Sequence, residues 1–440
     1  MMHALTRLRL LVAVLALGLL AAACGSEPEE AAEPAAPAAT EAVEDTEEPS
    51  AEPTADSTDM ATEMSPAPSE TAGQAGAAGP FGDLRLAATH VAEMSGPAIA
   101  GGVAQAAGIE GVDSDGAQLK SALSAGLQEH VYLAAITLEQ LLLDRGPAVE
   151  AATAALDENS VELADLVGSV APDQRDAFLE LWRNHIGFFV DYTAGVKAGD
   201  QAAQDEALAQ LDQYRADAGA FFEMVTGGAL PADAVASSLE EHVATTIATI
   251  DAFAAGDPAG FDLLKGAADH VANMSGPALA GGIAQATGME GVDSAGADLL
   301  TGLSTTLQEH VYLTGVFVEQ SLANPDAAEA AAATLDTNSV QLADIVGSVA
   351  PDQRDAFLEL WRNHIGFFAD YTAGLAAGDA AAQEEALAQL AQYQQDAGAF
   401  FEMVTGGALP ADAVASSLDE HVTTTITAID NLAAALGATG

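Results

Sequence analysis

The chain of 440 residues has few positive charges and a single cysteine. It holds 12 Lys plus Arg against 66 Asp plus Glu, which gives a formal net charge of −54. A surface of that sign repels nucleic-acid phosphates and anionic lipid headgroups, so we expect no nucleic-acid partner. Cations are the natural partners of such a surface, although acidic residues that only solvate a protein give the same composition.

The lack of cysteine and of common catalytic motifs narrows the chemistry further. Cys24 stands alone, which excludes a disulfide within the chain and any zinc or iron–sulfur site built from several cysteines. The sequence contains no Gly-x-Ser-x-Gly elbow and no phosphate-binding glycine loop with a lysine. These absences favour a binding or structural role over an enzymatic one, and they leave the question of an enzyme open.

Cys24 follows a segment with the features of an export signal. Arg7 and Arg9 begin it, residues 10–20 form an apolar run too short to span a bilayer, and three alanines precede the cysteine. This pattern resembles the lipobox of bacterial lipoprotein signal peptides, in which the cysteine becomes the lipidated first residue. The resemblance implies a signal peptide at 1–23 and a protein that is exported to the cell envelope, lipid-anchored to a membrane through Cys24 and facing outward. An ordinary cleaved secretory signal is the alternative.

The remainder divides into a linker and two repeats. Residues 24–80 are rich in Glu, Pro and Ala and contain no Lys or Arg, so we interpret them as a disordered acidic linker. From residue 81 the chain is a tandem duplication in which 81–260 matches 261–440. The stretch LWRNHIGFF, for example, occurs at 181–189 and again at 360–368. Two equivalent domains, 81–260 and 261–440, are therefore predicted.

Each repeat has the apolar periodicity of helices. Prolines and Gly-Asp pairs separate amphipathic segments, which predict helices near 83–94, 115–143, 148–168, 172–198, 201–227 and 231–254. Short connections make sequential helices antiparallel. The predicted fold is all-α, with two tandem antiparallel bundles of about six helices, each built from helical hairpins. The break at Ser95, Gly96 and Pro97 is expected to end the first helix.

Similar hairpins recur within a repeat, each beginning near a short histidine motif. These motifs are EHV at 129–131 and 241–243, NHI at 184–186 and DHV at 269–271. Over about residues 115–290 the pattern resembles a bacterial family of helical-hairpin repeat proteins that has no assigned activity. The resemblance implies an all-helical domain and no chemistry. Two arrangements stay open: each repeat is closed by its own leading helix, or the two repeats exchange ends.

A polar side chain interrupts the apolar stripe near the middle of each predicted helix. All histidines except His3 belong to this layer, which antiparallel packing would bring to one level. The candidate metal ligands are His90, Glu129, His130, His185, Asp217, Glu241 and His242, with His270, Glu309, His310, His364, Asp396, Glu420 and His421 in the second repeat. Asn159, Asn338, Met94 and Met274 are candidate supporting residues behind those ligands.

Imidazole and carboxylate ligands suit Cu, Zn, Fe or Mn, and the sequence does not choose among them. A His-x-x-x-Met pair at His90 and Met94 places nitrogen and thioether on one helix face, which slightly favours copper. The first hypothesis is therefore a membrane-tethered, surface-exposed bundle that binds a metal ion in each domain. The alternative is a structural or interaction lipoprotein in which the same layer is a buried hydrogen-bond network that fixes helix register.

Overall fold

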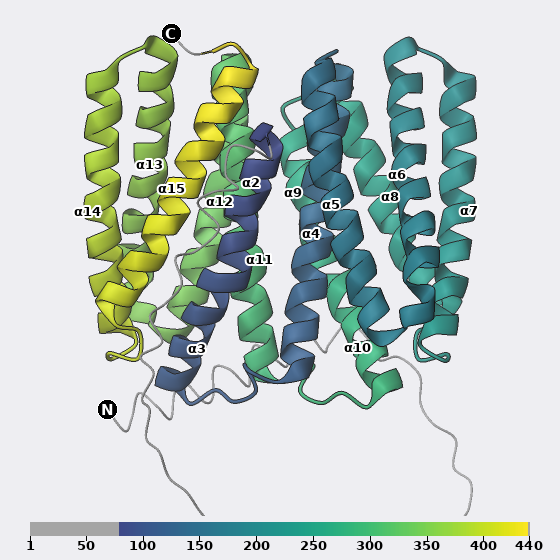
Figure 1. The fold of residues 1–440 in the computed structure, drawn as a ribbon, viewed down its shortest axis with the longest axis horizontal. Coiled ribbons are helices and arrows are strands. Elements are labelled where there is room, and N and C mark those ends of the chain that lie inside the picture. The colour runs from purple at the N-terminus through teal and green to yellow at the C-terminus, as the bar shows by residue number, and fades with distance from the viewer. Residues whose placement is uncertain (1–78, 439–440) are drawn as a thin grey trace, which may run out of the picture.

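The computed structural model describes residues 79–438, and every regular element in that range is helical. This confirms the predicted all-α bundle fold. The signal peptide, Cys24 and nearly all of the linker lie outside the described residues. Figure 1 shows long helices standing side by side, with α13–α15 on one flank, α6–α8 on the other and α4 and α11 in the middle.

The elements of the two repeats correspond one to one. The first repeat contains α2 (Gly79–His90), the π-helical turn η3 (Val91–Ser95), α3 (Gly96–Ala107), α4 (Asp115–Leu142), α5 (Gly146–Val170), the 3-10 turn η4 (Pro172–Gln174), α6 (Arg175–Ala198), α7 (Gln201–Val225) and α8 (Ala232–Ala255). The second contains α9 (Gly260–His270), the π-helical turn η5 (Val271–Ser275), α10 (Gly276–Thr287), α11 (Ala295–Ala323), α12 (Pro325–Val349), the 3-10 turn η6 (Pro351–Gln353), α13 (Arg354–Ala377), α14 (Ala380–Val404) and α15 (Ala411–Ala435).

Local sequence sets where the long helices begin and end. Ser114 caps α4, because its Oγ accepts a hydrogen bond from the backbone N–H of Ala117 at 3.2 Å. Asp200 caps α7 in the same way. Gly199 ends α6 and Gly256 ends α8, both in the left-handed conformation that glycine adopts without strain. These residues therefore fix where α4 and α7 begin and where α6 and α8 end.

The expected break at Gly96 and Pro97 is a π-helical turn, and the chain stays helical through it. Pro97 has no N–H, and its ring would collide with a carbonyl of the preceding turn in a regular α-helix. The chain responds by widening one turn, in which the Gly96 N–H donates to the Val91 carbonyl, five residues back. The same turn recurs at Val271–Ser275 before Pro277. The prediction that the helix ends here is therefore wrong.

The two repeats exchange their leading helices. In the first repeat, α2 packs mainly on α15 and makes smaller contacts of equal extent with α11 and with α5 of its own repeat, and α3 packs on α11. In the second, α9 packs mainly on α8 and α4, and α10 packs on α4. One bundle is thus α4–α10, and the other combines α2 and α3 with α11–α15. Packing crosses the sequence boundary at residue 260, which selects the exchanged arrangement of the two that the sequence left open.

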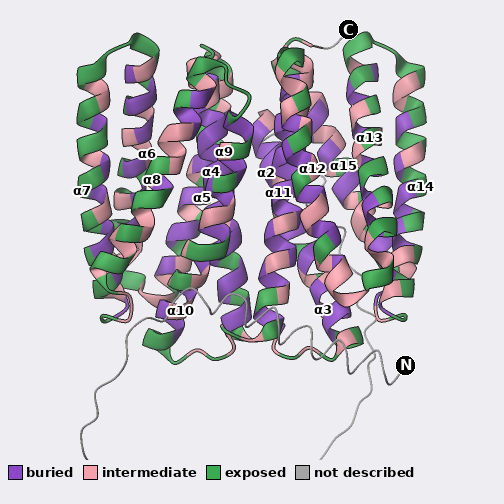
Figure 2. Cartoon of the chain, turned by 180° about the vertical axis from the view of Figure 1, so that it is seen from behind, coloured by how far each residue is buried: buried purple, intermediate pink, exposed green. Residues whose placement is uncertain are grey.

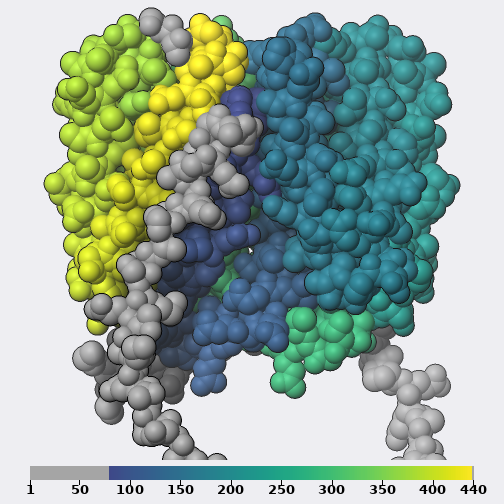
Figure 3. All heavy atoms as spheres, in the orientation of Figure 1, coloured from purple at the N-terminus to yellow at the C-terminus, as the bar shows by residue number. Residues whose placement is uncertain are grey.

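The seam between the bundles is polar and pseudo-symmetric. The rings of Tyr132 on α4 and Tyr312 on α11 stack with centroids 5.2 Å apart. Tyr132 Oη donates to the buried Glu309 carboxylate at 2.9 Å. Buried residues concentrate on the central helices, whereas α7 and α14 expose much of their surface (Figure 2). Atoms of α2 lie between those of α15 and those of α5 (Figure 3).

The loops before α4 and α11 tie the two repeats together at one end of the seam. The Gly116 N–H donates to the Glu290 carbonyl at 3.1 Å, and the Gly296 N–H donates to the Glu110 carbonyl at 3.2 Å. A Cβ atom at Gly116 would lie 2.4 Å from the Glu290 oxygen, so only glycine allows this approach. The reciprocal bonds show that the exchange is built into both loops.

The isolated first repeat, residues 79–260, is expected to form a homodimer. Its α2 and α3 normally pack on the other repeat, and a second copy offers nearly the same surface. Size-exclusion chromatography with light scattering measures the mass. A folded monomer at micromolar concentration would contradict the prediction, because it would show that α2 and α3 close on their own repeat.

Candidate metal centre

Three helices of the first repeat each bring one histidine to the same level of the bundle. His130 lies near the middle of α4, His185 near the middle of α6 and His242 near the middle of α8. All three side chains are buried. The equivalent histidines of the second repeat, His310, His364 and His421, come from α11, α13 and α15 and are also buried. We call these two sets the first and the second triad.

The geometry of each triad fits a single ion. One ligand nitrogen from each of the three imidazoles lies within 4.8 Å of the others in both triads. Nε2 of His185 lies 3.2 Å from Nε2 of His130, and the corresponding distance between His364 and His310 is 3.3 Å. Two nitrogens that bind one tetrahedral zinc ion, each at about 2.05 Å, are about 3.3 Å apart. The closest pair therefore already stands at ligand spacing.

Aromatic rings enclose the first triad. The Trp182 ring lies with its centroid 4.7 Å from that of His130 and 4.5 Å from that of His185. Tyr214 on α7 stacks on His185 at 4.6 Å, and Phe189 meets His242 edge to face at 6.0 Å. The second triad has the same enclosure, with Trp361, Tyr393 and Phe368 in these places. These rings restrict the rotation of the imidazoles and keep bulk water away from them.

Burial keeps the imidazoles neutral. Desolvation, followed by the charge of the neighbouring histidine, lowers the pKa of His185 to about 3. Desolvation also lowers the pKa of His242 to about 4 and holds that of His130 well below its usual range. In the second triad the pKa of His421 is lowered to about 4 for the same reason. A neutral imidazole is the form that binds a metal, so the triads need not lose protons at neutral pH.

His270 and His90 lie beside the triads but outside them. Nδ1 of His270 is 3.5 Å from the Glu241 carboxylate, and its buried Nε2 has no hydrogen-bond partner among the described residues. A positive charge on His270 would lower the pKa of His242, which places the two rings near one another. His90 lies 3.7 Å from Glu420 in the same relation to the second triad. Each of these histidines reaches its triad through the helix exchange.

The acidic candidates on α7 and α14 point away from the triads. Asp217 and Asp396 are exposed, and each accepts a hydrogen bond from the glutamine one turn earlier on its own helix. The inward stripe of α7 runs through Leu211, Tyr214 and Ala218, so Asp217 falls one residue off it. The predicted place of the aspartate at the histidine level is taken by the ring of Tyr214. The structure therefore places neither Asp217 nor Asp396 among the candidate metal ligands.

The glutamates directly before His130 and His310 form ion pairs in the seam between the bundles and do not face the triads. Glu129 and Glu309 are buried in the seam, because a neighbouring residue on a helix points about 100° away. Glu129 pairs with Arg85 of α2, and Glu309 pairs with Lys265 of α9 at 3.1 Å. Burial raises the pKa of Glu129 to about 7, and the charge of Arg85 opposes the shift. Neither glutamate belongs to the triads.

The supporting residues predicted for the triads divide into two pairs. Asn159 donates to the Gly126 carbonyl at 3.0 Å, and Asn338 donates to the Thr306 carbonyl at 2.9 Å, so both join neighbouring helices. Met94 and Met274 are 62% and 60% exposed. The π-helical turn begins directly after His90 and after His270, and it rotates each methionine off the histidine face. The methionines therefore give no support for copper.

The sequence did not predict two features of this centre: the aromatic rings that contact the histidines and a pair of serines beside the first triad. Trp182 and Tyr214 fit the helical spacing of core residues, and only the assembled bundle shows that they press on the imidazoles. Ser238 and Ser275 approach each other beside the first triad, with Oγ atoms 3.3 Å apart. No sequence signal could have joined these serines, because α9 and its π turn reach this bundle only by exchange.

No protein-family model, curated protein or solved structure matches this chain. The case for the centre therefore rests on its geometry. Within residues 79–438 no helix combines the length and apolarity needed to cross a membrane.

The stability that the triads contribute to the metal-free protein is expected to fall as the pH falls from about 6.5 to about 4. The pKa values of His185, His242 and His421 are about 3 to 4 in the fold. The unfolded chain, with histidine pKa values near 6.5, takes up protons that the folded chain excludes. The contribution of the triads to stability is thus fully present above about pH 6.5 and is lost on acidification. Burial raises the pKa of Glu129 and that of Glu309 to about 7, and these carboxyl groups contribute in the opposite direction, so the effect of the triads is measured against a variant.

Urea unfolding across this pH range measures the effect, with a His185→Phe and His364→Phe variant for comparison. The variant is expected to show a shallower acid slope than the wild type, because it removes one excluded proton from each triad. Equal slopes would contradict the burial of neutral imidazoles as the cause.

Proposed function

We propose that this protein binds one transition-metal ion in each of its two bundles, through the first and second triads, while its N-terminus tethers it outside the cell membrane. The observation that carries the metal site is the convergence of three buried imidazoles, with ligand nitrogens within 4.8 Å of one another, twice in one chain. Two helix sets with equivalent sequences produce the same cluster, so the arrangement follows from the residues shared by both repeats.

The donor set favours zinc, copper or iron over manganese among the metals considered. The triads supply three imidazoles and no carboxylate, and imidazole suits Zn, Cu and Fe, whereas Mn prefers oxygen ligands. Three histidine ligands leave one position of a tetrahedral ion open. An open position suits storage, sensing or transfer of the ion, and it also suits binding of an exogenous ligand. Because each triad consists of histidines that would all be occupied as ligands, with no carboxylate among them, we propose a binding protein and not an enzyme.

The hydrogen bonding of the layer is incomplete. Nε2 of His130 and Nε2 of His185 are within hydrogen-bond distance at 3.2 Å, while Nδ1 of His130 and Nδ1 of His242 are buried without a hydrogen-bond partner among the described residues. A polar layer that only fixes register gains stability when all its members are satisfied, and unsatisfied buried atoms cost about 1 to 3 kcal/mol each. Coordination of an ion between the Nε2 atoms would supply a free-energy gain that such a layer lacks, and it would leave the Nδ1 atoms as they are.

Metal binding is expected to reach two ions per chain, one for each triad. His130→Ala and His185→Ala are each expected to reduce this to one, with affinity at the first triad at least about 100-fold weaker, because a ligand is lost. Metal analysis after purification without chelator, and melting curves with added Zn²⁺ or Cu²⁺, measure both effects. The intact second triad is an internal control for folding.

Asp217→Ala is the matched control on the first bundle. Asp217 is exposed and bonded only within its own helix, so its loss is expected to leave both the metal content and the metal-dependent melting unchanged. Wild-type protein that carries no metal above background, and whose melting does not respond to either ion, would refute the metal site. A protein that stays folded and equally or more stable when both triads are replaced by apolar residues of similar size would then favour the structural alternative.

The tether has its own test. Arg7, Arg9, the apolar run at 10–20 and Cys24 support lipidation at the cysteine. Expression in a bacterial host with an alkyne fatty acid is expected to label the wild type and place it in the membrane fraction. Cys24→Ala is expected to lose both. A labelled Cys24→Ala variant, or an unlabelled wild type released as a free secreted protein, would contradict the lipid anchor and favour an ordinary cleaved signal.

A further inference from the structure

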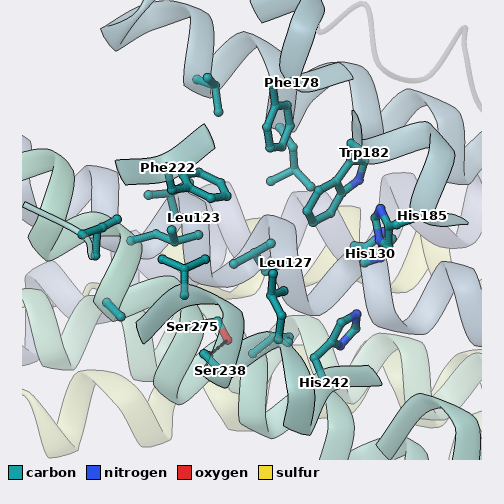
Figure 4. Close-up of a pocket in the computed structure, with 18 of the residues that line it drawn as sticks. Leu123, Leu127, His130, Phe178, Trp182, His185, Phe222, Ser238, His242 and Ser275 are labelled. Atoms are coloured by element: carbon teal, nitrogen blue, oxygen red, sulfur yellow. Dashed lines mark hydrogen bonds between the residues drawn. The ribbon is translucent and has the colours of Figure 1, made fainter. Parts of the chain in front are cut away.

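An apolar cavity adjoins each triad. The first has a volume of about 130 Å³, and the side chains of His130, His185 and His242 form part of its wall. Figure 4 shows these three histidines grouped at one end, with Leu123 and Phe222 toward the other. A cavity of about 90 Å³ beside the second triad includes His310 and His421 in its wall. A void of this kind at the same place in both bundles is a common feature of the repeat.

The mostly apolar lining of the first cavity determines which molecules it can bind. Apart from the histidines, Trp182, Tyr214 and two serines, the side chains around the first cavity are aliphatic or phenyl groups. The indole N–H of Trp182 is buried and has no hydrogen-bond partner among the described residues. The two serines, Ser238 and Ser275, lie within hydrogen-bond distance of each other and so offer little to a guest. An engineered cavity of about 150 Å³ lined by Leu, Ile and Phe stays dry and takes benzene or xenon. A guest in the first cavity is accordingly small and mostly apolar.

The cavity reaches the protein surface. Ala234 at the start of α8 and Ala278 on α10 both line it and are both exposed. The equivalent residues of the second bundle, Ala413 on α15 and Ala98 on α3, line the second cavity and are also exposed. Two short side chains thus leave an entrance between a helix of one repeat and the exchanged helix of the other.

The other side of the first triad is more confined. A space of about 20 Å³ there is lined by His130, His242, Thr246 and Thr249 among other residues, and it has room for about one water molecule. Along α4 and α8 the histidines therefore separate a site of water size from a site of the size of a small organic molecule. An ion held by the triad has access to both.

We infer that each cavity binds a small apolar or aromatic molecule that carries one metal-binding donor atom, and that this atom completes the coordination of the ion in the adjoining triad. The inference deepens the proposed metal function and rests on it. The histidines at the inner end supply the ion, the apolar wall holds the body of the molecule, and the alanine entrance admits it. No bond is made or broken in the guest other than its coordinate bond to the metal.

The experiment compares two probes on Co²⁺-loaded protein, because the visible spectrum of Co²⁺ reports a change of ligands. 4-Phenylimidazole and imidazole present the same donor, and only the first has an apolar body. We expect 4-phenylimidazole to bind at least roughly tenfold more tightly, because burial of a phenyl ring is worth a factor of that order or more. Equal affinities would overturn the inference.

A variant that narrows the entrances of both cavities tests whether 4-phenylimidazole binds inside them. It replaces Ala98, Ala234, Ala278 and Ala413 by leucine. The matched control replaces four exposed alanines on the outer helices, which line neither cavity: Ala209, Ala220, Ala388 and Ala399. The entrance variant is expected to bind Co²⁺ normally and to weaken 4-phenylimidazole at least roughly tenfold, whereas the control keeps wild-type affinity. An entrance variant that binds the probe as the wild type does would overturn the inference.

Benzene binding to the metal-free protein, measured by NMR, tests whether the cavity binds an apolar molecule without any coordination to a metal. Saturable benzene binding that the entrance variant loses supports the cavity as a binding site. If Co²⁺ does not bind at all, the proposed metal function and the coordination of the guest both fail, whatever benzene does. If Co²⁺ binds but neither benzene nor 4-phenylimidazole does, the metal function stands and the cavity inference is overturned.

Discussion

The burial of three neutral imidazoles at one level of an apolar bundle is the constraint on which the rest of the structure depends. Each ring must come from a different helix, because His130, His185 and His242 converge within 4.8 Å. The helices α4, α6 and α8, which alternate with the antiparallel α5 and α7, must therefore bring their midpoints to one level, and the caps at Ser114 and Gly256 fix where α4 begins and where α8 ends. Desolvation then keeps the rings uncharged, so their mutual repulsion does not push the helices apart.

Much of this centre follows from helical periodicity alone. A polar residue in the middle of an apolar stripe has to face the core, and this reasoning places His130, His185 and His242 together without any model of the fold. It fails for Asp217, whose helix has two residues close to the inward direction, and packing there selects the ring of Tyr214. It fails for Glu129 in another way, since a buried glutamate next to a buried histidine faces a different neighbour.

The exchange of leading helices could not be derived from the sequence for a specific reason. The two repeats are so similar that α2 and α9 fit either bundle with nearly the same contacts, and local propensity is the same in both arrangements. In the exchanged arrangement the first turns of α4 and α11 bond reciprocally, because the Gly116 N–H donates to the Glu290 carbonyl and the Gly296 N–H donates to the Glu110 carbonyl. Such contacts join residues far apart in the chain, where periodicity and capping rules carry no information.

The exchange divides the metal centre into two parts of different origin. All three ligands of the first triad belong to the first repeat, whereas Val271, Ser275 and Ala278 of the cavity wall come from the second. Ion binding thus requires one repeat, but the apolar cavity and its entrance require both. A guest in the cavity would contact α8 and α10 together and so stabilise the association of the repeats. The pseudo-symmetric pairing then sets the shape of the ligand site, while the ligands to the metal stay within a single repeat.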